Sequence, residues 1–229
     1  MDAVADILYK ASVWVLPALV AITLHEAAHG FAAYVFGDDT AKRAGRMSLN
    51  PLRHVDPFGT IVLPGILLLM RAPFLFGYAK PVPVNFWRLN PPRLGMIMVA
   101  AAGPAMNVAI AFACALAFHV VEDLPAYVGP WAAENLENAV VLNLVLAVFN
   151  MLPVPPLDGG RVLVGLLPRP LAFQLAKLER VGILLVIGVL FLLPLIGRQL
   201  GINLSISPWL IEAPVEYLLR VIVTLAGLE

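Results

Sequence analysis

Few of the side chains in this sequence carry a charge. Asp, Glu, Lys and Arg together make up 13% of the 229 residues, whereas 61% are apolar, and the mean hydropathy is +0.88. Because soluble domains carry about 25% charged residues, this composition excludes an ordinary soluble domain and indicates a multi-pass integral membrane protein surrounded by the lipid bilayer. The 15 basic residues balance the 15 acidic ones, so we expect no nucleic-acid partner.

Cysteine is nearly absent as well. The single residue, Cys114, excludes a disulfide within the chain and lies in an apolar run, as a packing residue would. The N-terminus lacks the basic stretch of a signal peptide, so we expect the first apolar run to be a retained helix. Repeats, low-complexity tracts and long soluble inserts are also missing. We therefore predict one membrane domain over residues 1–229.

Against this apolar background, the most informative polar stretch is His25-Glu26-Ala27-Ala28-His29. Histidines four residues apart lie on one helix face about one turn apart, so both rings can reach a single ion. Zinc suits neutral imidazoles, and Glu26 is placed as a general base that acts on zinc-bound water without being a ligand. A charge at bilayer depth costs about 2.5 to 3.5 kcal/mol or more, so we expect Glu26 to have a function there.

A second polar stretch supplies a third metal ligand. Asp158 is the only acidic residue between Glu137 and Glu179, and prolines and glycines surround it in the stretch 153–160. Alone, it reads as a helix-end aspartate at the membrane interface. Together with His25 and His29, however, it completes a three-ligand site that leaves a fourth position open to water, as a catalytic zinc requires. We predict one Zn²⁺ per chain.

The apolar runs predict an all-α fold with about five transmembrane helices. They cover approximately residues 4 or 12 to 36, 91–121, 140–152, 171–196 and 208–226. The run 58–78 is too short and interrupted for a span, which needs about 20 residues, so we predict a re-entrant segment there. In residues 80–85 prolines alternate with β-branched residues, which excludes helix and favours a short extended edge strand. The re-entrant and β part thus covers about residues 58–90.

Charge placement and the metal site together predict the topology. We expect residues 122–138 to form an external loop, because they include four acidic residues and neither Lys nor Arg. Two histidines and Asp158 can share an ion only if the helix ends near residues 36 and 158 lie at the same membrane face. That requires the segment 58–78 to return instead of crossing. The N-terminus is then external and the metal site lies toward the cytoplasm.

Asn107 and Asn150 are the remaining candidate site residues. Asn107 ends the stretch Gly103-Pro104-Ala105-Met106-Asn107, in which Gly103 and Pro104 can kink a helix and let a neighbour approach closely. Asn107 then either forms an interhelical hydrogen bond or contacts substrate, and both roles are compatible. Asn150 begins the stretch that leads to Asp158.

The three motifs, in this order and within apolar helices, resemble the site-2 protease family of intramembrane zinc metalloproteases. Ser48-Leu49-Asn50-Pro51 and Lys80 to Asn85 also resemble the compact bacterial members, which lack a PDZ or CBS domain. The resemblance implies a catalytic core over about residues 10–165, with accessory C-terminal helices over about 171–227. It makes His25, His29 and Asp158 zinc ligands and Glu26 the catalytic glutamate. It also implies that Asn107 and Asn150 line the site near the scissile bond.

The activity implied is hydrolysis of peptide bonds within or near transmembrane segments of single-span membrane proteins, in the inner membrane of a bacterial cell. Such a substrate must be unwound. In an extended 80–85 segment, Pro81 and Pro83 leave one edge without backbone N–H donors. Val82 and Val84 keep their N–H groups, which point to the other edge. This second edge could hold the substrate as an added strand. The alternative is a polytopic zinc-binding transporter or regulator, in which Glu26 would have no use as a base. The sequence does not predict the oligomeric state.

Overall fold

The computed structural model describes residues 3–62, 66, 80–121 and 123–228, and these residues form helices and turns without a β-strand. The α-helices are α1 (Ala3–Val35), α2 (Thr40–Arg43), α4 (Pro92–Ala117), α5 (Gly129–Asn150), α6 (Asp158–Leu166), α7 (Arg169–Ala176), α8 (Gly182–Ile187), α9 (Leu193–Gln199) and α10 (Ala213–Ala226). Short 3-10 or π turns join them: η1 (Pro51–Arg53), η2 (Pro57–Val62), η3 (Phe86–Arg88), η4 (Phe118–Val120), η5 (Lys177–Arg180), η6 (Gly188–Leu192) and η7 (Pro208–Glu212). The predicted all-α class is thereby confirmed.

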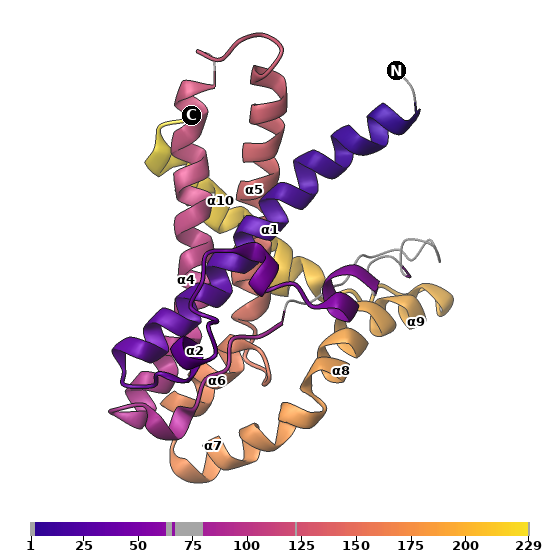
Figure 1. Ribbon diagram of the computed structural model, residues 1–229. Coiled ribbons are helices and arrows are strands. Elements are labelled where there is room, and N and C mark those ends of the chain that lie inside the picture. Colours follow the sequence, from indigo (N-terminus) through magenta and orange to yellow (C-terminus); the bar gives the residue numbers. More distant parts are fainter. Residues whose placement is uncertain (1–2, 63–65, 67–79, 122, 229) are drawn as a thin grey trace.

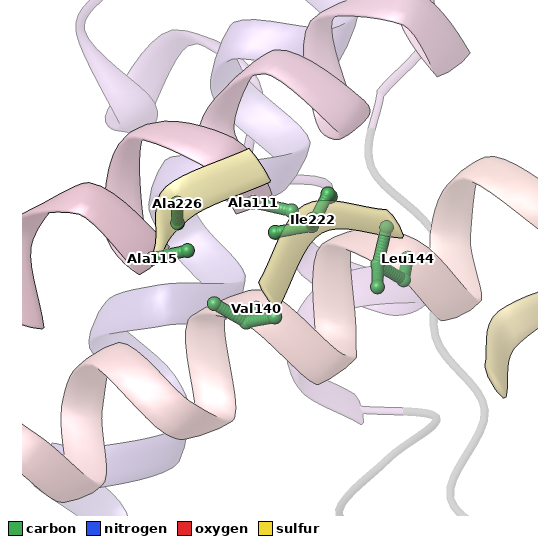
Figure 2. Packing of buried hydrophobic residues seen from close by; sticks show 6 residues of the cluster. All are labelled: Ala111, Ala115, Val140, Leu144, Ile222 and Ala226. Atoms are coloured by element: carbon green, nitrogen blue, oxygen red, sulfur yellow. The ribbon is translucent and has the colours of Figure 1, made fainter. Parts of the chain in front are cut away.

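Four helical segments of the described chain are long and apolar enough to cross a membrane. They are Leu8–Val35, Pro92–Val120, Gly129–Asn150 and Gly182–Gln199. The fifth expected span, about residues 208–226, is not among them. Its residues form η7 and α10, which contain three charged residues, Glu212, Glu216 and Arg220. Helix α10 packs across α4 and α5, and Figure 2 shows its Ile222 and Ala226 against the small and branched side chains of those two helices.

Helices α1, α4 and α5 form the central bundle, and each packs against the other two. Figure 1 shows α4 and α5 running antiparallel, with α1 crossing them at an angle. The small residues of α4 permit close contact: Ala100, Ala111 and Ala115 are almost completely buried.

Helix α5 begins earlier than the sequence predicts. The expected loop over residues 122–138 is wrong in its second half, because α5 starts at Gly129 with Pro130 in its first turn. Two polar residues in this part of the chain bond to α1. Glu134 accepts a hydrogen bond of 2.7 Å from the Tyr9 hydroxyl, and the Asn138 amide donates to the Val13 carbonyl at 3.0 Å. Hydropathy alone cannot distinguish such an interhelical contact from a solvated loop.

The segment between α1 and α4 ends close to where it begins. The Lys80 N–H donates to the His54 carbonyl at 2.9 Å, and the Asn90 N–H donates to the Phe36 carbonyl at 2.8 Å. Most of the predicted re-entrant segment, residues 63–65 and 67–79, lies outside the described residues. Its two flanks nevertheless lie side by side, so the end of α1 at Val35 and the start of α4 at Pro92 share one end of the bundle.

Residues 80–85 follow the second half of α1 in the same direction. Val82 lies against Gly30 of α1, and Val84 packs in the cluster of Ala33. Farther along, the buried Asp38 carboxylate accepts the Asn85 N–H at 2.6 Å. The predicted edge strand has no ladder partner among the described residues, and the segment is held by α1 and its C-terminal loop.

The outer end of this segment is fixed by an ion-pair group. Arg88 of η3 lies 2.6 Å from the Asp39 carboxylate, which also pairs with Arg43 at the same distance. Desolvation acts to raise the pKa of Asp39, but the hydrogen bond from Arg43 and the charges of Arg43 and Arg88 outweigh it, so the pKa lies below its ordinary value. Asp39 therefore stays anionic and keeps η3 beside the end of α1.

Candidate metal centre

Three side chains converge between α1 and α6. His25 Nε2 and His29 Nε2 are 3.0 Å apart, and Asp158 Oδ2 lies 3.3 Å from the first and 3.4 Å from the second. A tetrahedral zinc ion with bonds of about 2.0–2.1 Å holds its ligand atoms roughly 3.3–3.4 Å apart, so the three atoms fit one face of such a tetrahedron. The side chains are only 8–12% exposed. This group can hold one metal ion.

Hydrogen bonds on the opposite ring nitrogens orient both imidazoles. His25 Nδ1 donates to Asn107 Oδ1 at 2.5 Å, and His29 Nδ1 donates to the Val99 carbonyl at 2.7 Å. Both acceptors lie on α4. With the protons on Nδ1, the Nε2 lone pairs of both rings face Asp158 Oδ2, a buried oxygen without a hydrogen-bond donor among the described residues. The two Nε2 atoms and Asp158 Oδ2 are therefore three hydrogen-bond acceptors that face one another with no proton between them. A bound cation would stabilise this arrangement.

Gly103 lets α4 approach the two rings. A Cβ at this position would lie 2.6 Å from His25 Nε2 and would collide with His29 Nε2. The close approach predicted for Gly103 is therefore present, and its partner is the metal centre itself. The adjacent Pro104 has no N–H, so the carbonyl of Ala100 loses its helical partner, and Ala100 lies at the wall of the cavity beside the site.

Two glycines set the position of Asp158 at the start of α6. After α5 the chain folds back in residues 151–157, and the first turn of α6 lies directly on this loop. A Cβ at Gly159 would meet the carbonyl of Met151, and one at Gly160 would meet the backbone of Pro155. Both residues are buried. Because only glycine fits, the carboxylate of Asp158 is turned toward α1 on a short, tightly anchored helix.

The centre opens into a cavity of about 420 Å³ that is lined by the three candidate ligands and by Glu26, Asn150 and Arg161, among others. Glu26 Oε2 accepts the Val82 N–H at 2.7 Å. The side-chain amide of Asn150 donates to the Leu146 carbonyl at 3.0 Å. The cavity therefore contains a carboxylate that is not a ligand and an amide beside it.

Asn107 lies elsewhere. It is completely buried and stands behind His25, on the side of the ring away from the cavity. The structure thus brings together His25, Glu26, His29, Asp158 and Asn150 around one space, and it joins Asn107 to them through the His25 ring.

Two further polar residues near the site, Asn143 and Arg161, were not predicted from the sequence. Asn143 of α5 is completely buried and hydrogen-bonded to Asn107. It is the only polar residue in the run 139–149 and lies two helical turns before Asn150, a signal that could have identified it. Arg161 lines the cavity and lies 3.2 Å from Glu179. Its position three residues after Asp158 places it on the same helix face.

Comparison with known proteins agrees with this geometry. The profile described as Peptidase family M50 matches residues 128–195. Over 188 residues, the chain is 40% identical to YwhC of Bacillus subtilis, which is named as an inferred zinc metalloprotease. The match covers 79% of this chain and 80% of YwhC. The chain belongs to peptidase family M50, the site-2 protease family.

A second M50 relative, Rip2 of Mycobacterium tuberculosis, is also named as an inferred zinc metalloprotease. It is 30% identical over 194 residues, which cover 85% of this chain and 71% of Rip2. Among solved structures, none gives a significant match. As a member of M50, the chain is a zinc metalloprotease. Its long apolar helices make it a membrane protein.

Proposed function

We propose that this M50 protein is an intramembrane endopeptidase, which hydrolyses peptide bonds within or near the transmembrane segment of single-span membrane proteins. One observation supports this most directly: the buried metal-ligand group and the carboxylate of Glu26 share a cavity between helices that are long and apolar enough to span a bilayer. A substrate helix that enters from the lipid would meet the site at membrane depth.

In this proposal the chain's own groups have separate tasks. His25, His29 and Asp158 hold the zinc ion, which when bound acidifies water and polarises a peptide carbonyl. Glu26 accepts the proton from the attacking water and later delivers it to the leaving amine, so one carboxylate serves as base and then as acid. The Asn150 amide, which lies at the cavity wall, donates to the oxygen that becomes negative in the transition state.

We further propose that the site lies toward the cytoplasmic side of a bacterial inner membrane. The α1 end that is nearest to the site is followed by the basic residues Lys42, Arg43, Arg46 and Arg53. Residues 121–128, which join α4 to α5 at the other end of the bundle (Figure 1), have two acidic residues and no basic one. Basic residues concentrate in cytoplasmic loops, which supports this orientation.

The decisive experiment compares wild type with Glu26→Gln. The variant keeps its zinc, because Glu26 is not one of the three converging ligands, but it loses proteolysis because the amide cannot accept a proton. Zinc content of the purified protein is measured by mass spectrometry. Cleavage is followed in cells as the accumulation of an uncut single-span protein in the Glu26→Gln membranes.

Asp158→Ala is the companion variant, and it should lose both zinc and activity because a ligand is removed. A Glu26→Gln protein that cleaves its substrate at the wild-type rate would refute the role of Glu26 as the base. If wild-type and Glu26→Gln membranes both contain zinc-loaded protein but no protein accumulates uncut in the variant, a zinc-binding transporter or regulator would be favoured, because the glutamate has no catalytic task there. Full zinc occupancy in Asp158→Ala would remove that residue from the ligand set.

A further inference from the structure

A chain of three buried hydrogen bonds connects α5 to the metal centre. The Asn143 amide nitrogen donates to the Ala139 carbonyl at 2.8 Å, and Asn143 Oδ1 accepts from the Asn107 amide nitrogen at 2.8 Å. Asn107 Oδ1 in turn accepts from His25 Nδ1 at 2.5 Å. Asn107 and Asn143 are both 0% exposed, so water does not compete for these bonds.

The direction of every bond in this chain follows from its first acceptor. A backbone carbonyl can only accept, so the nitrogen end of the Asn143 amide must face Ala139 and its oxygen must face Asn107. The Asn107 amide is then turned with its nitrogen toward Asn143 and its oxygen toward His25. An oxygen facing His25 Nδ1 requires the proton on that nitrogen, which leaves the lone pair on Nε2, the atom beside His29 Nε2 and Asp158 Oδ2.

We infer that Asn143 is a positioning residue of the metal centre: it fixes the orientation of the Asn107 amide and thereby the tautomer of His25. The inference rests on the proposed function only in that His25 is taken as a zinc ligand. Asn143 contacts neither the cavity nor the ligand atoms. The Asn107 nitrogen also donates to the Ala21 carbonyl, but at 3.5 Å this hydrogen bond is long and weak. Without Asn143, only this weak bond opposes a half-turn of the Asn107 amide, which would present its nitrogen to His25 Nδ1. His25 would then be protonated on Nε2 and could not bind the metal through that atom.

The test uses Asn143→Leu, which keeps the side-chain size but removes the acceptor. We expect zinc affinity, measured by chelator competition on purified protein, to fall about tenfold, the lower end of the range for partners that orient a metal ligand. In metal-free protein with ¹⁵N-labelled histidine, NMR reports which ring nitrogen is protonated. His25 should be protonated on Nδ1 in wild type and on Nε2 in a substantial fraction of Asn143→Leu.

Asn135→Leu is the matched control. Asn135 lies on the same helix, is 8% exposed, and donates to the carbonyl four residues earlier, Trp131, at 2.8 Å. It is remote from Asn107, so this variant should lose stability without a change in zinc affinity or in the His25 tautomer. Equal losses of zinc affinity in both variants would mean that Asn143 acts only through packing, and would overturn the inference.

A second substitution distinguishes orientation from packing. In Asn107→Asp both ends of the side chain are oxygens, so His25 Nδ1 meets an acceptor in either orientation. The double variant Asn107→Asp with Asn143→Leu should therefore bind zinc as tightly as Asn107→Asp alone. A further tenfold loss in the double variant would refute the inference. Failure of the wild type to bind zinc would instead refute the proposed function.

Discussion

At the scale of single residues, the site depends on close contact as much as on its ligands. Gly103 has no role in the chemistry, yet a methyl group there would occupy the space of the two Nε2 atoms. The helix α4 cannot simply withdraw, because Asn107 and Val99 of the same helix hold the histidine rings from the other nitrogen.

We therefore expect Gly103→Ala to lose zinc and activity together. The added methyl must displace either the rings or α4, and a ligand moved by a few tenths of an ångström no longer matches the tetrahedral distances. Zinc content after dialysis is the measurement. Gly188→Ala provides the control, because its Cβ would meet no atom within 4 Å. Wild-type zinc occupancy in Gly103→Ala would show that the rings can adapt.

The sequence predicted the residues of the metal group better than their surroundings. Two histidines one turn apart and a lone aspartate in an apolar region limit the chemistry severely, and the structure brings these side chains together. The position of Asn107 behind His25 was not predictable, because helical spacing gives the face of a residue and not which side of a neighbour's ring it contacts. Asn143 was missed because an asparagine in an apolar run has the same pattern whether it bonds to its own helix or to another.

At the scale of elements, residues 80–85 bring backbone donors to the cavity. The N–H groups of Val82 and Val84 point to the same side of an extended segment, and both residues line the cavity. The Val82 N–H is engaged by Glu26, whereas none of the described residues accepts from the Val84 N–H. An unwound substrate that pairs with this edge would therefore find the Val84 N–H free to donate and the Val82 N–H already bonded to the Glu26 carboxylate.

Val84→Pro should reduce proteolysis while zinc content remains at the wild-type level. A backbone hydrogen bond contributes about 0.5–1.5 kcal/mol, so we expect the turnover rate to fall by up to roughly tenfold. Val84→Ala, which keeps the N–H, should stay close to wild type. Val82→Pro should be the more severe change, because it also removes the contact to Glu26. Equal turnover in Val84→Pro and Val84→Ala would argue against strand pairing at this edge.

Element boundaries were predicted well at the end of α1 and the start of α4, and poorly at the start of α5. The first helix ends at Val35 and the second begins at Pro92, each within one residue of the expected position. The start of α5 was predicted at residue 140 and lies at Gly129, eleven residues earlier. The error arose because polar side chains in the first turns of α5 form hydrogen bonds to α1. Such tertiary pairing is invisible to hydropathy.

At the scale of the whole molecule, the metal joins the first transmembrane helix to α6. Because ligands from both parts must be in place, zinc binds the folded chain and stabilises it by mass action, about 2.7 kcal/mol at a free concentration one hundred times the Kd. We expect chelation to lower the melting temperature of the purified protein in detergent. His25→Ala should melt at one temperature with and without zinc, and a zinc-dependent shift in that variant would locate the stabilising metal elsewhere.

Cysteine labelling tests the proposed orientation. In a Cys114→Ala background, single cysteines at Leu49, Trp87 and Tyr127 are suitable reporters, since these side chains are 64%, 95% and 86% exposed. The first two should be protected from an impermeant external reagent and the third labelled; detergent-solubilised protein, in which all three react, is the control. External labelling at Trp87 would place the cavity on the other side of the membrane.

The separation of the ligands along the chain also bears on how the protein is made. His25 and His29 leave the ribosome early, but Asp158 follows only after more than two thirds of the 229 residues have been synthesised. Until then the first helix offers two imidazoles and a glutamate but no complete site. Nascent membrane proteins crowd the site of insertion and are themselves extended, cleavable chains. A hydrolase whose last metal ligand lies on a late helix therefore has no complete metal site while its first helices are being synthesised.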